Sequence, residues 1–463
     1  MRHVDPIAIG QIAFNHLGGD RLSEWYRDGL GLLPSGATFF GGPPATKVNG
    51  LPFPLFGGRW LMDGRDWFQL EFFRFLHPTS LPRRADETPA DLGYRRVGFH
   101  VRDFDATLAR LAELGSEPWG PVLGAPGERR TCVRDPEGNW VELMEADPLT
   151  DSAPAKTRPE VPATVRSVTI SVADLDAARE AWVEGVGLEP AKIASLHQPE
   201  HEALWGLEGA SSRCLVLDGG GVLVELVEYT SPKGRPRPDA YRICDQGLMN
   251  VAIAVRDRET FDRTFARWVE RGLRPTNPTP LEVGIFRVMY FDLPSGQNVE
   301  LIYPRRWAWK LTGFAPAGVE VAEEVLLDAP PEAVFAALAD HDGLARWSPF
   351  AMERLEAGNP DPNGLGALRR VRMGPLAFDE RVISWDPPHH YTYTVEKGPL
   401  VRRHRGDVQV RRDGDRTRVR WAIQIGLALP GAGKPTGWLL RRKVRGTLDR
   451  LAGEIARSGQ SRS

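Results

Sequence analysis

The alternation of hydrophobic and polar positions repeats one order of elements along the first 305 residues. Residues 7–14 alternate as a half-buried strand does, residues 20–30 have apolar positions at helical spacing, and short strands follow. A strand at 95–101 and a helix at 104–115 begin a second cycle, which again ends in strands. The pattern predicts a βαβββ module twice in each of two segments, four modules in all.

The two segments are diverged copies of each other. Three blocks recur in the same order: 24–34 with 180–190, 100–118 with 254–275, and 135–143 with 293–301. Their offset is nearly constant, at 154 between residues 101 and 255 and at 158 between residues 142 and 300. Because chance similarity would not keep order and spacing, the blocks indicate a duplication.

Two stretches without apolar periodicity divide the chain. Residues 150–164 are rich in Pro, Ala and charge, whereas residues 305–318 are more aromatic and are expected to pack against a neighbouring domain. The predicted domains are 1–150, 160–305 and 319–457, each of ordinary size.

The third domain begins with a strand pattern at residue 319, and Asp328 with the prolines that follow it then opens a helix. Further strand patterns follow, with a hairpin turn at Asp413-Gly414. Residues 437–456 have the pattern of a long amphipathic helix. The whole chain is therefore expected to be an α+β protein of three domains.

Composition and charge narrow the function classes. A chain of 463 residues with 41% hydrophobic and 26% charged residues can bury ordinary cores, and a net charge of −2 gives no nucleic-acid footprint. No apolar run approaches the roughly 18 residues of a membrane span, and the N-terminus lacks a secretory pattern. Three widely spaced cysteines predict neither a disulfide framework nor a zinc knuckle. A cytoplasmic protein is expected, with no nucleic-acid or membrane partner.

The motifs D-G-L-G-L (28–32) and D-P-x-G-N-x-x-E-L (135–143) resemble those of the vicinal-oxygen-chelate superfamily of glyoxalases, extradiol dioxygenases and bleomycin-resistance proteins. The resemblance covers residues 1 to about 305. It implies that paired βαβββ modules curl into cups whose inner strands carry metal ligands. One glyoxalase-like cup is expected in each segment.

Carried over from this resemblance, the ligand positions are Gln11, Glu71, Arg96 and Glu142 in the first segment and Ser167, Glu225, Asn250 and Glu300 in the second. Glyoxalases have His or Gln, then Glu, His and Glu, and extradiol dioxygenases have two His and a Glu. Neither copy has a histidine at these positions. Oxygen-activating iron needs two imidazoles and a carboxylate, so extradiol cleavage is disfavoured.

The first cup is expected to keep a weak set of oxygen donors, Gln11, Glu71 and Glu142. Arg96 stays protonated and cannot bind a metal, but it can neutralise a neighbouring carboxylate. The chain is therefore expected to need no cofactor, with a divalent metal in the first cup as the alternative. Buried carboxylates at these positions should have either ionic partners or raised pKa values.

Histidines near the cups leave alternatives open. His100 lies four residues after Arg96 on the same strand face, so it is either a displaced ligand, a general base or a histidine bound by a nearby carboxylate. His197 and His201 have a spacing that suits zinc on a helix, but a loop over the cup mouth is the alternative.

Residues 319 to about 457, with APPEAVFAALADHDGLARWSP near their start, resemble the START-like polyketide cyclase/dehydrase (SRPBCC) superfamily. The resemblance implies a curved sheet that grips a C-terminal helix around an apolar cavity. Tyr391, Tyr393, Trp421 and His404 are candidates for lining that cavity, and core or sheet-surface positions are the alternative.

The leading hypothesis is an enzyme that isomerises, cyclises or dehydrates an apolar, oxygenated, polyketide-like molecule. Glu71, His100 and Glu142 of the first cup would transfer protons, and the second cup would be mainly structural. The alternatives are a non-catalytic ligand-binding or antibiotic-resistance protein and a metal-dependent glyoxalase-like lyase; a homodimer is left open. The candidate ligand-binding residues are Gln11, Trp67, Arg96, Ser167, Glu225, Asn250, Glu300, Tyr391 and Tyr393.

Overall fold

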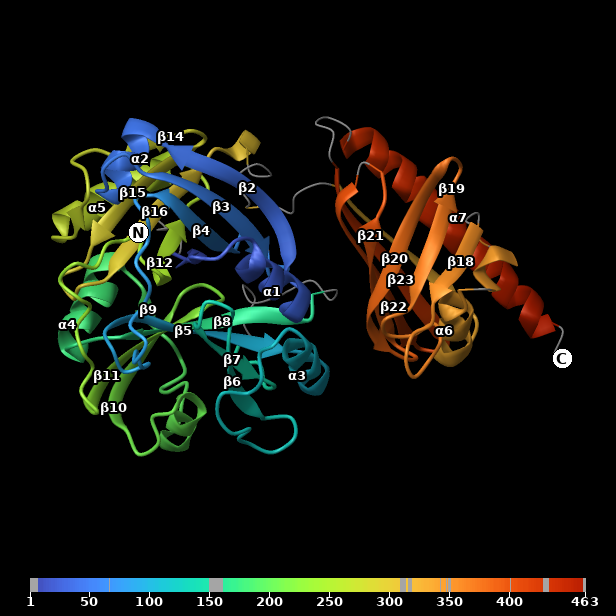
Figure 1. Cartoon of the computed structure of the whole chain (residues 1–463), viewed down its shortest axis with the longest axis horizontal. Helices are drawn as coiled ribbons and strands as arrows, with labels where there is room; N and C mark the ends of the chain where they lie inside the picture. The colour runs from blue at the N-terminus through green and yellow to red at the C-terminus, as the bar shows by residue number, and fades with distance from the viewer. Residues whose placement is uncertain are drawn as a thin grey trace. The chain divides into compact units, whose positions relative to one another are not determined.

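The computed structural model describes residues 7–65, 67–149, 161–308, 314, 319–341, 343–346, 348, 351–399, 401–427 and 433–460 (Figure 1). They form two compact units, Met1–Pro316 and Ala317–Ser463. Of the predicted linker at 150–164, residues 150–160 lie outside the described residues, whereas Ala163 and Thr164 already belong to the strand β8 (Ala163–Ser171). In the second predicted linker, Phe314 packs on Trp67 with ring centroids 4.7 Å apart, so this aromatic residue belongs to the first unit.

The first unit contains the four modules in chain order. The first holds β1 (Ile9–Asn15), α1 (Arg21–Leu30), β2 (Leu33–Gly41), α2 (Gly42–Asn49), β3 (Leu55–Met62) and β4 (Gln69–His77). The second holds β5 (Gly93–Val101), α3 (Phe104–Glu113), β6 (Arg130–Arg134) and β7 (Trp140–Met144). Here two isolated bridges, between Pro118 and Val133 and between Leu123 and Arg130, stand in place of the expected additional strand.

The second half of the unit repeats this order. The third module holds β8 (Ala163–Ser171), α4 (Leu175–Arg179), the π-helical turn η2 (Glu180–Val186), β9 (Glu189–Pro190), the 3-10 segment η3 (Pro199–Trp205), β10 (Ser211–Asp218) and β11 (Leu223–Ser231). The fourth holds β12 (Gly247–Ala254), α5 (Arg258–Glu270), β13 (Arg274–Pro275), β14 (Leu281–Val283), β15 (Phe286–Asp292), β16 (Asn298–Pro304) and η4 (Arg306–Ala308).

The modules pair across the two segments. One sheet has the order β13-β15-β16-β12-β1-β4-β3-β2, and the other has the order β6-β7-β5-β8-β11-β10-β9. Modules 1 and 4 therefore build one cup, which we call the outer cup, and modules 2 and 3 build the inner cup. The expectation of one cup within each segment is wrong, because β1 pairs with β12 and β5 pairs with β8.

The D-G-L-G-L motif at 28–32 and its counterpart E-G-V-G-L at 184–188 have the same packing role in the two segments. Gly31 and Gly187 end their helical segments with φ of 67° and 98°, a left-handed conformation that glycine adopts without strain. A Cβ on Gly29 would lie 2.4 Å from Leu111, and one on Gly185 would lie 2.7 Å from Leu273. The motif therefore stops one helix and lets it approach the next.

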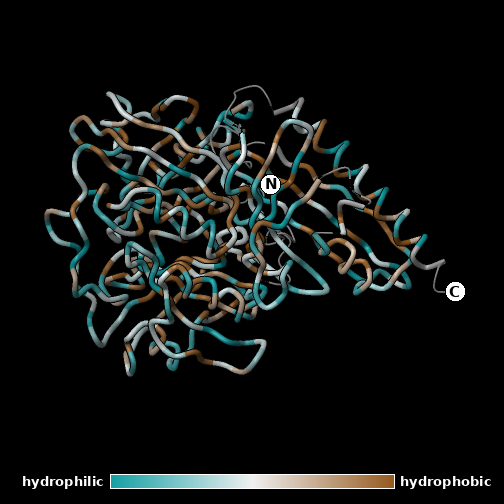
Figure 2. Tube along the Cα trace, turned by 45° about the vertical axis from the view of Figure 1, so that its right-hand side comes forward, coloured by the Kyte–Doolittle hydropathy of each residue, from teal (hydrophilic) through white to brown (hydrophobic). Residues whose placement is uncertain are grey.

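One continuous apolar core joins the four modules. Strand alternation sends Ile12 and Phe14 of β1 into this core, together with Trp182 and Trp268 from the third and fourth modules. Gln11, the residue before Ile12, belongs to the other face of the strand. Figure 2 shows the resulting alternation of hydrophobic and hydrophilic residues along the chain.

The second unit is an antiparallel sheet with a long C-terminal helix. Its elements are β17 (Val319–Leu327), α6 (Pro331–Ala339), η5 (Gly343–Arg346), β18 (Ala351–Glu356), β19 (Leu368–Met373), β20 (Leu376–Asp386), β21 (His390–Lys397), β22 (Val401–Asp413), β23 (Arg416–Leu427) and α7 (Gly433–Gln460). The strand order is β17-β23-β22-β21-β20-β19-β18. Val444, Leu448 and Leu451 of α7 are buried in its core, which confirms the predicted helix-grip fold.

Two smaller expectations concern the cysteines and the membrane. Cys132, Cys214 and Cys244 are all free, as their spacing predicts. Over the described ranges, no helix combines the length and the apolar character that a membrane span requires.

The pairing predicts that the first segment is not an independent monomer. A fragment of residues 1–149 would lose β12 and β8, the strands that pair with β1 and β5, and would expose two sheet edges. We expect this fragment to dimerise or aggregate, whereas residues 1–316 give a folded monomeric unit. Size-exclusion chromatography with light scattering checks this, and a cooperatively folded monomer of 1–149 would contradict the pairing.

Candidate functional site

The outer cup brings together four polar side chains from four neighbouring strands. Gln11 on β1 and Asn250 on β12 lie at its centre, with Glu71 on β4 and Glu300 on β16 on either side. The strand register places Ala13 of β1 between Glu71 and Asn250. In the same way, it places Ala252 of β12 between Gln11 and Glu300. The cup thus holds two carboxyls and two amides, separated only by small residues.

The two carboxyls of the outer cup are buried without a basic partner. Glu71 and Glu300 are each 4% exposed, and no described Lys, Arg or His forms an ion pair with either. The Trp60 indole donates a hydrogen bond to Glu71 at 2.6 Å. Burial raises the pKa of Glu71 to about 8 despite this bond, and burial with the nearby Glu71 carboxylate raises the pKa of Glu300 well above its usual range.

The two amides are also poorly satisfied. Gln11 is 1% exposed, and neither its Oε1 nor its Nε2 has a hydrogen-bond partner among the described residues. Asn250 donates to Asn298 Oδ1 at 3.2 Å, but its own Oδ1 has no partner there. Buried polar groups are normally bonded, so these amides indicate a missing ligand or water.

An apolar pocket adjoins the two carboxyls, with about 420 Å³ of empty space that is partly open to solvent. Glu71, Glu300, Tyr290 and Asn49 form its polar part. Its walls are mainly aromatic and aliphatic: Phe40, Phe56, Phe73, Phe286, Val288 and Ile302. Burial, with the charges of Glu300 and Glu71, raises the pKa of Tyr290, so this phenol stays protonated. The lining is that of a site for a small apolar molecule.

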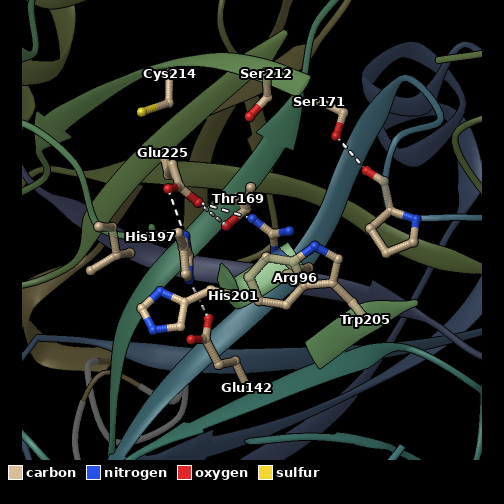
Figure 3. Close-up of polar contacts among 12 residues, drawn as sticks. Arg96, Glu142, Thr169, Ser171, His197, His201, Trp205, Ser212, Cys214 and Glu225 are labelled. Carbon is tan, nitrogen blue, oxygen red and sulfur yellow. Dashed lines mark hydrogen bonds and ion pairs between the residues drawn. The ribbon is translucent and has the colours of Figure 1, made fainter. Parts of the chain in front are cut away.

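The inner cup has carboxylates at the strand positions equivalent to those of the outer cup. Here, basic side chains of the protein itself bind these carboxylates. His197 lies between Glu142 on β7 and Glu225 on β11, as Figure 3 shows. Its Nε2 is 2.7 Å from Glu142 Oε2, and its Nδ1 is 2.7 Å from Glu225 Oε1. Only 8% of the His197 side chain is exposed.

Arg96 is the second cation that contacts Glu225 (Figure 3). It donates to Glu225 Oε2 and to Tyr229 Oη, each at 3.1 Å, and its guanidinium stacks 3.6 Å from the Trp205 ring. Thr169 Oγ1 also donates to Glu225, at 2.9 Å. Arg96 therefore forms its ion pair with Glu225, a partner that the sequence did not suggest. Its charge also helps to lower the pKa of Glu142, one of the two suggested partners, whereas Glu71 belongs to the other sheet.

Electrostatics in the inner cup favour the fully ionised state. Burial opposes ionisation of Glu142 and Glu225, but the charge and hydrogen bonds of His197 outweigh it and hold both pKa values at about 2. Burial would lower the pKa of His197, yet the two carboxylates raise it. The imidazolium is thus the bridging cation of the inner cup.

The predicted catalytic set Glu71, His100 and Glu142 is not brought together. Glu71 belongs to the outer cup and Glu142 to the inner cup, because their modules join different sheets. His100 Nδ1 instead lies 3.6 Å from Asp147, which is the carboxylate-bound alternative. Burial lowers the pKa of His100, with Arg166 and Arg102 nearby contributing. For the same topological reason, the predicted metal set Gln11, Glu71 and Glu142 is divided.

The other candidates fall in three places. Ser167 pairs with Gly98 in the inner cup, where a Cβ on Gly98 would lie 2.2 Å from the serine hydroxyl. Trp67 belongs to an apolar cluster with Trp60 and donates to the Ala254 carbonyl at 3.1 Å. His201 accepts from the Gln198 N–H at 2.8 Å and does not join His197 as a zinc pair.

The second unit encloses its own apolar cavity of about 620 Å³. Tyr393, Trp421 and His404 line it, together with Arg369, which is bound to Glu380 at 2.9 Å. Burial and Arg369 lower the pKa of His404 to about 3, so this imidazole is neutral at physiological pH. Tyr391 does not line the cavity; its hydroxyl donates to the Leu338 carbonyl at 3.2 Å.

Sequence reasoning missed two features of these sites. It did not anticipate that His197 bridges the inner cup, since this residue lies in a connection without periodicity and its only signal was a local cluster of histidines. It also did not group Asn250 and Glu300 with Gln11 and Glu71. Within the described ranges, no group of three or more His, Cys, Asp or Glu is arranged to hold a metal ion.

Comparison with known proteins separates the two units. Residues 318–456 match the family model described as polyketide cyclase / dehydrase and lipid transport. A START superfamily protein from Mycobacterium smegmatis is similar at 16% identity, covering 30% of this chain and 99% of that chain, with a TM-score of 0.28. No curated protein matches the chain.

The remaining similarities cover the first unit. Glyoxalase I from Zea mays is similar at 16% identity, over 64% of this chain and 92% of that chain, with a TM-score of 0.43. A putative dioxygenase from Bacillus subtilis is similar at 13% identity, over 66% and 88%, with a TM-score of 0.45. The family model thus matches the second unit, and these two structures are similar to the first unit.

The His197 bridge predicts a pH-dependent contribution to stability. Its pKa is raised on folding, so its stabilisation is complete below the ordinary value of 6.5 and is lost as pH rises through the raised value. At pH 6, His197→Gln should lower the free energy of unfolding by about 1.5–3 kcal/mol, because Glu142 and Glu225 lose the cation that they share and keep only Arg130 and Arg96, respectively. The difference from the parent protein should shrink toward pH 9.

Urea denaturation at several pH values measures this difference. His201→Gln is the matched control, since His201 neighbours the bridge but contacts neither carboxylate through a hydrogen bond. A His197→Gln loss no larger than that of the control, or one independent of pH, would refute the imidazolium bridge.

Proposed function

We propose that the outer cup binds an apolar, oxygen-bearing small molecule and catalyses a proton transfer on it, as in isomerisation, cyclisation or dehydration. The observation that carries the proposal is the pair Glu71 and Glu300, buried beside an aromatic pocket with no described basic partner. Carboxyls with raised pKa values can exchange protons near neutral pH. The inner cup, in which each carboxylate is already bound to a cation, has a structural role in this proposal.

The two carboxyls have different roles. Trp60 donates a hydrogen bond to Glu71, which favours its ionised form, whereas Glu300 lies beside Glu71 without such a donor among the described residues. Glu71 is therefore the group that takes a proton from a carbon of the ligand. Glu300 stays protonated and donates a hydrogen bond, and then the proton, to the ligand oxygen. Repulsion between the two carboxyls keeps both from ionising together.

A divalent cation is the second candidate for this cup. Gln11, Glu71, Asn250 and Glu300 offer only oxygen donors on the ligand side, a set that suits a hard cation such as Mg²⁺ or Mn²⁺. The unpartnered Gln11 Oε1 and Asn250 Oδ1 favour this alternative. A bound cation would supply Lewis-acid polarisation of a ligand oxygen. The residues fit the group, although no imidazole is among them.

A third reading is binding without turnover, as for a resistance protein that sequesters its ligand. The aromatic walls of the pocket are compatible with it. In the second unit, the cavity lined by Tyr393 and Trp421 would hold an apolar ligand or product. The experiments below separate turnover from binding alone.

Proton transfer predicts exchange of carbon-bound hydrogen. Incubated in D₂O with enolisable apolar ketones such as benzoylacetone or phenylacetone, the protein should accelerate loss of the α-proton NMR signal. Glu71→Gln should slow the catalysed exchange by about 100-fold or more, because the amide cannot accept the proton. Glu24→Gln, an exposed change on α1, is the control. Saturable binding of these ketones without exchange would favour the sequestering protein.

The raised pKa of Glu71 predicts a pH effect that is independent of any substrate. A carboxyl with a raised pKa stabilises the fold below its ordinary value of 4.5, and this contribution is lost as pH rises toward about 8. Glu71→Gln should therefore flatten the decline in melting temperature between pH 5 and pH 9. An unchanged slope would show that Glu71 is ionised throughout.

Binding of Mn²⁺, followed by electron paramagnetic resonance, tests the cation alternative. The parent protein should bind one Mn²⁺ per chain, and Glu300→Gln should weaken binding at least 10-fold, because one carboxylate donor becomes neutral. Glu24→Gln again serves as the control. Equal Mn²⁺ affinity in the parent protein and Glu300→Gln would exclude the outer cup as the cation site.

A further inference from the structure

A third cavity lies outside both cups, where the two connections between modules meet. It has about 740 Å³ of empty space, part of which is open to solvent. It is lined by residues of the connection 78–92, of the connection 232–246, of the strands that follow them and of the start of β7. The two connections are equivalent in the duplicated segments, at an offset of 154 between Gly93 and Gly247, the first residues of β5 and β12. The cavity is thus built from corresponding parts of both halves.

Arg83 and Arg237 occupy equivalent positions in the two connections, again at an offset of 154. Each lies against the glycine that begins the strand after the other connection. A Cβ on Gly93 would meet Arg237 Nε and Nη2 at 2.7 Å, and one on Gly247 would meet Arg83 Nη2 at 3.8 Å. Both guanidiniums are therefore held at the cavity by the same local geometry.

Their partners differ. Arg83 donates to the Gly138 carbonyl at 2.9 Å and to the Asn139 side chain, and it lies 3.5 Å from Glu87. Arg237 stacks on the Tyr241 ring at 4.2 Å, but it has no hydrogen bond or ion pair with any described residue. The duplication has thus kept an arginine at a position where its protein partners are missing.

The carboxylates of the cavity lining are already engaged by other groups. Glu87 is shared between Arg95 at 2.5 Å and Arg83. Asp245 accepts from Arg242 at 2.7 Å and from the Leu81 N–H at 2.8 Å. The lining carries four arginines, Arg83, Arg84, Arg95 and Arg237, against these two acids, which leaves an excess of positive charge.

An independent observation comes from Trp140, which lines the same cavity. It is 2% exposed, and its indole N–H has no hydrogen-bond partner among the described residues. Buried indole N–H groups normally find an acceptor. Tyr94 and Tyr241 add aromatic surface to this lining.

We propose that this cavity binds a small organic anion, with its carboxylate or phosphate held by Arg237 and its aromatic or apolar body against Tyr241 and Trp140. Guanidinium groups pair with planar carboxylates and with phosphates through two parallel hydrogen bonds. The site is separate from the outer cup, so the proposal does not depend on proton transfer there.

Isothermal titration calorimetry with phenyl phosphate, benzoate and inorganic phosphate tests the site on the full chain. One of the two aromatic anions should bind at one site per chain and more tightly than inorganic phosphate, and the tighter of them identifies the head group. Arg237→Gln should weaken this binding at least 10-fold. Arg258→Gln, an exposed change on α5, should leave it unchanged.

Three results would overturn the proposal: no binding of any of the three anions, inorganic phosphate binding as tightly as the aromatic ones, or equal affinity in Arg237→Gln. A melting temperature within the range of Arg258→Gln shows that Arg237→Gln is folded. Glu71→Gln should bind the anion as the parent protein does, which separates this site from the outer cup.

Discussion

A carboxylate buried on an inner strand has to gain a cation or keep a proton, and the first unit depends on how each cup meets this constraint. The inner cup supplies Arg96 and His197, so Glu142 and Glu225 stay ionised. The outer cup supplies only the Trp60 indole among the described residues, so Glu71 and Glu300 have raised pKa values. The same fold thus produces one cup whose carboxylates are neutralised by cations of the protein and one cup whose carboxyls can exchange protons or bind a cation.

The division between the cups follows from small differences at equivalent positions. Asn250 of the outer cup and Arg96 of the inner cup occupy matching strands, as do Gln11 and Ser167. A neutral amide leaves the carboxyls of the outer cup without a counter-charge, whereas a guanidinium fills the inner cup and stacks on Trp205. The connection before η3 then places His197 between Glu142 and Glu225.

Alternation and repeat spacing were enough to predict the modules, and the resemblances to known families supplied the helix-grip unit and the strand positions of the eight cup residues. They were not enough to predict which module pairs with which. Equivalent strands such as β1 and β8 have similar apolar patterns, so the sequence is compatible with either pairing, and the observed one moved Glu142 away from Gln11 and Glu71. His197 lies in an irregular connection, where no periodicity relates a residue to a strand, so its contacts depend on tertiary structure alone.

The nested pairing also sets an order of assembly during synthesis. Modules 2 and 3 follow each other along the chain, so β5 and β8 meet across a short separation and the inner cup can close first. Strand β1 must wait for its partner β12, which lies more than two hundred residues further along the chain. The hydrogen bond from Asn15 to Asp245 spans a similar separation. The first module therefore leaves the ribosome with an unpaired strand edge, and this edge is open to pairing with other chains until the fourth module arrives.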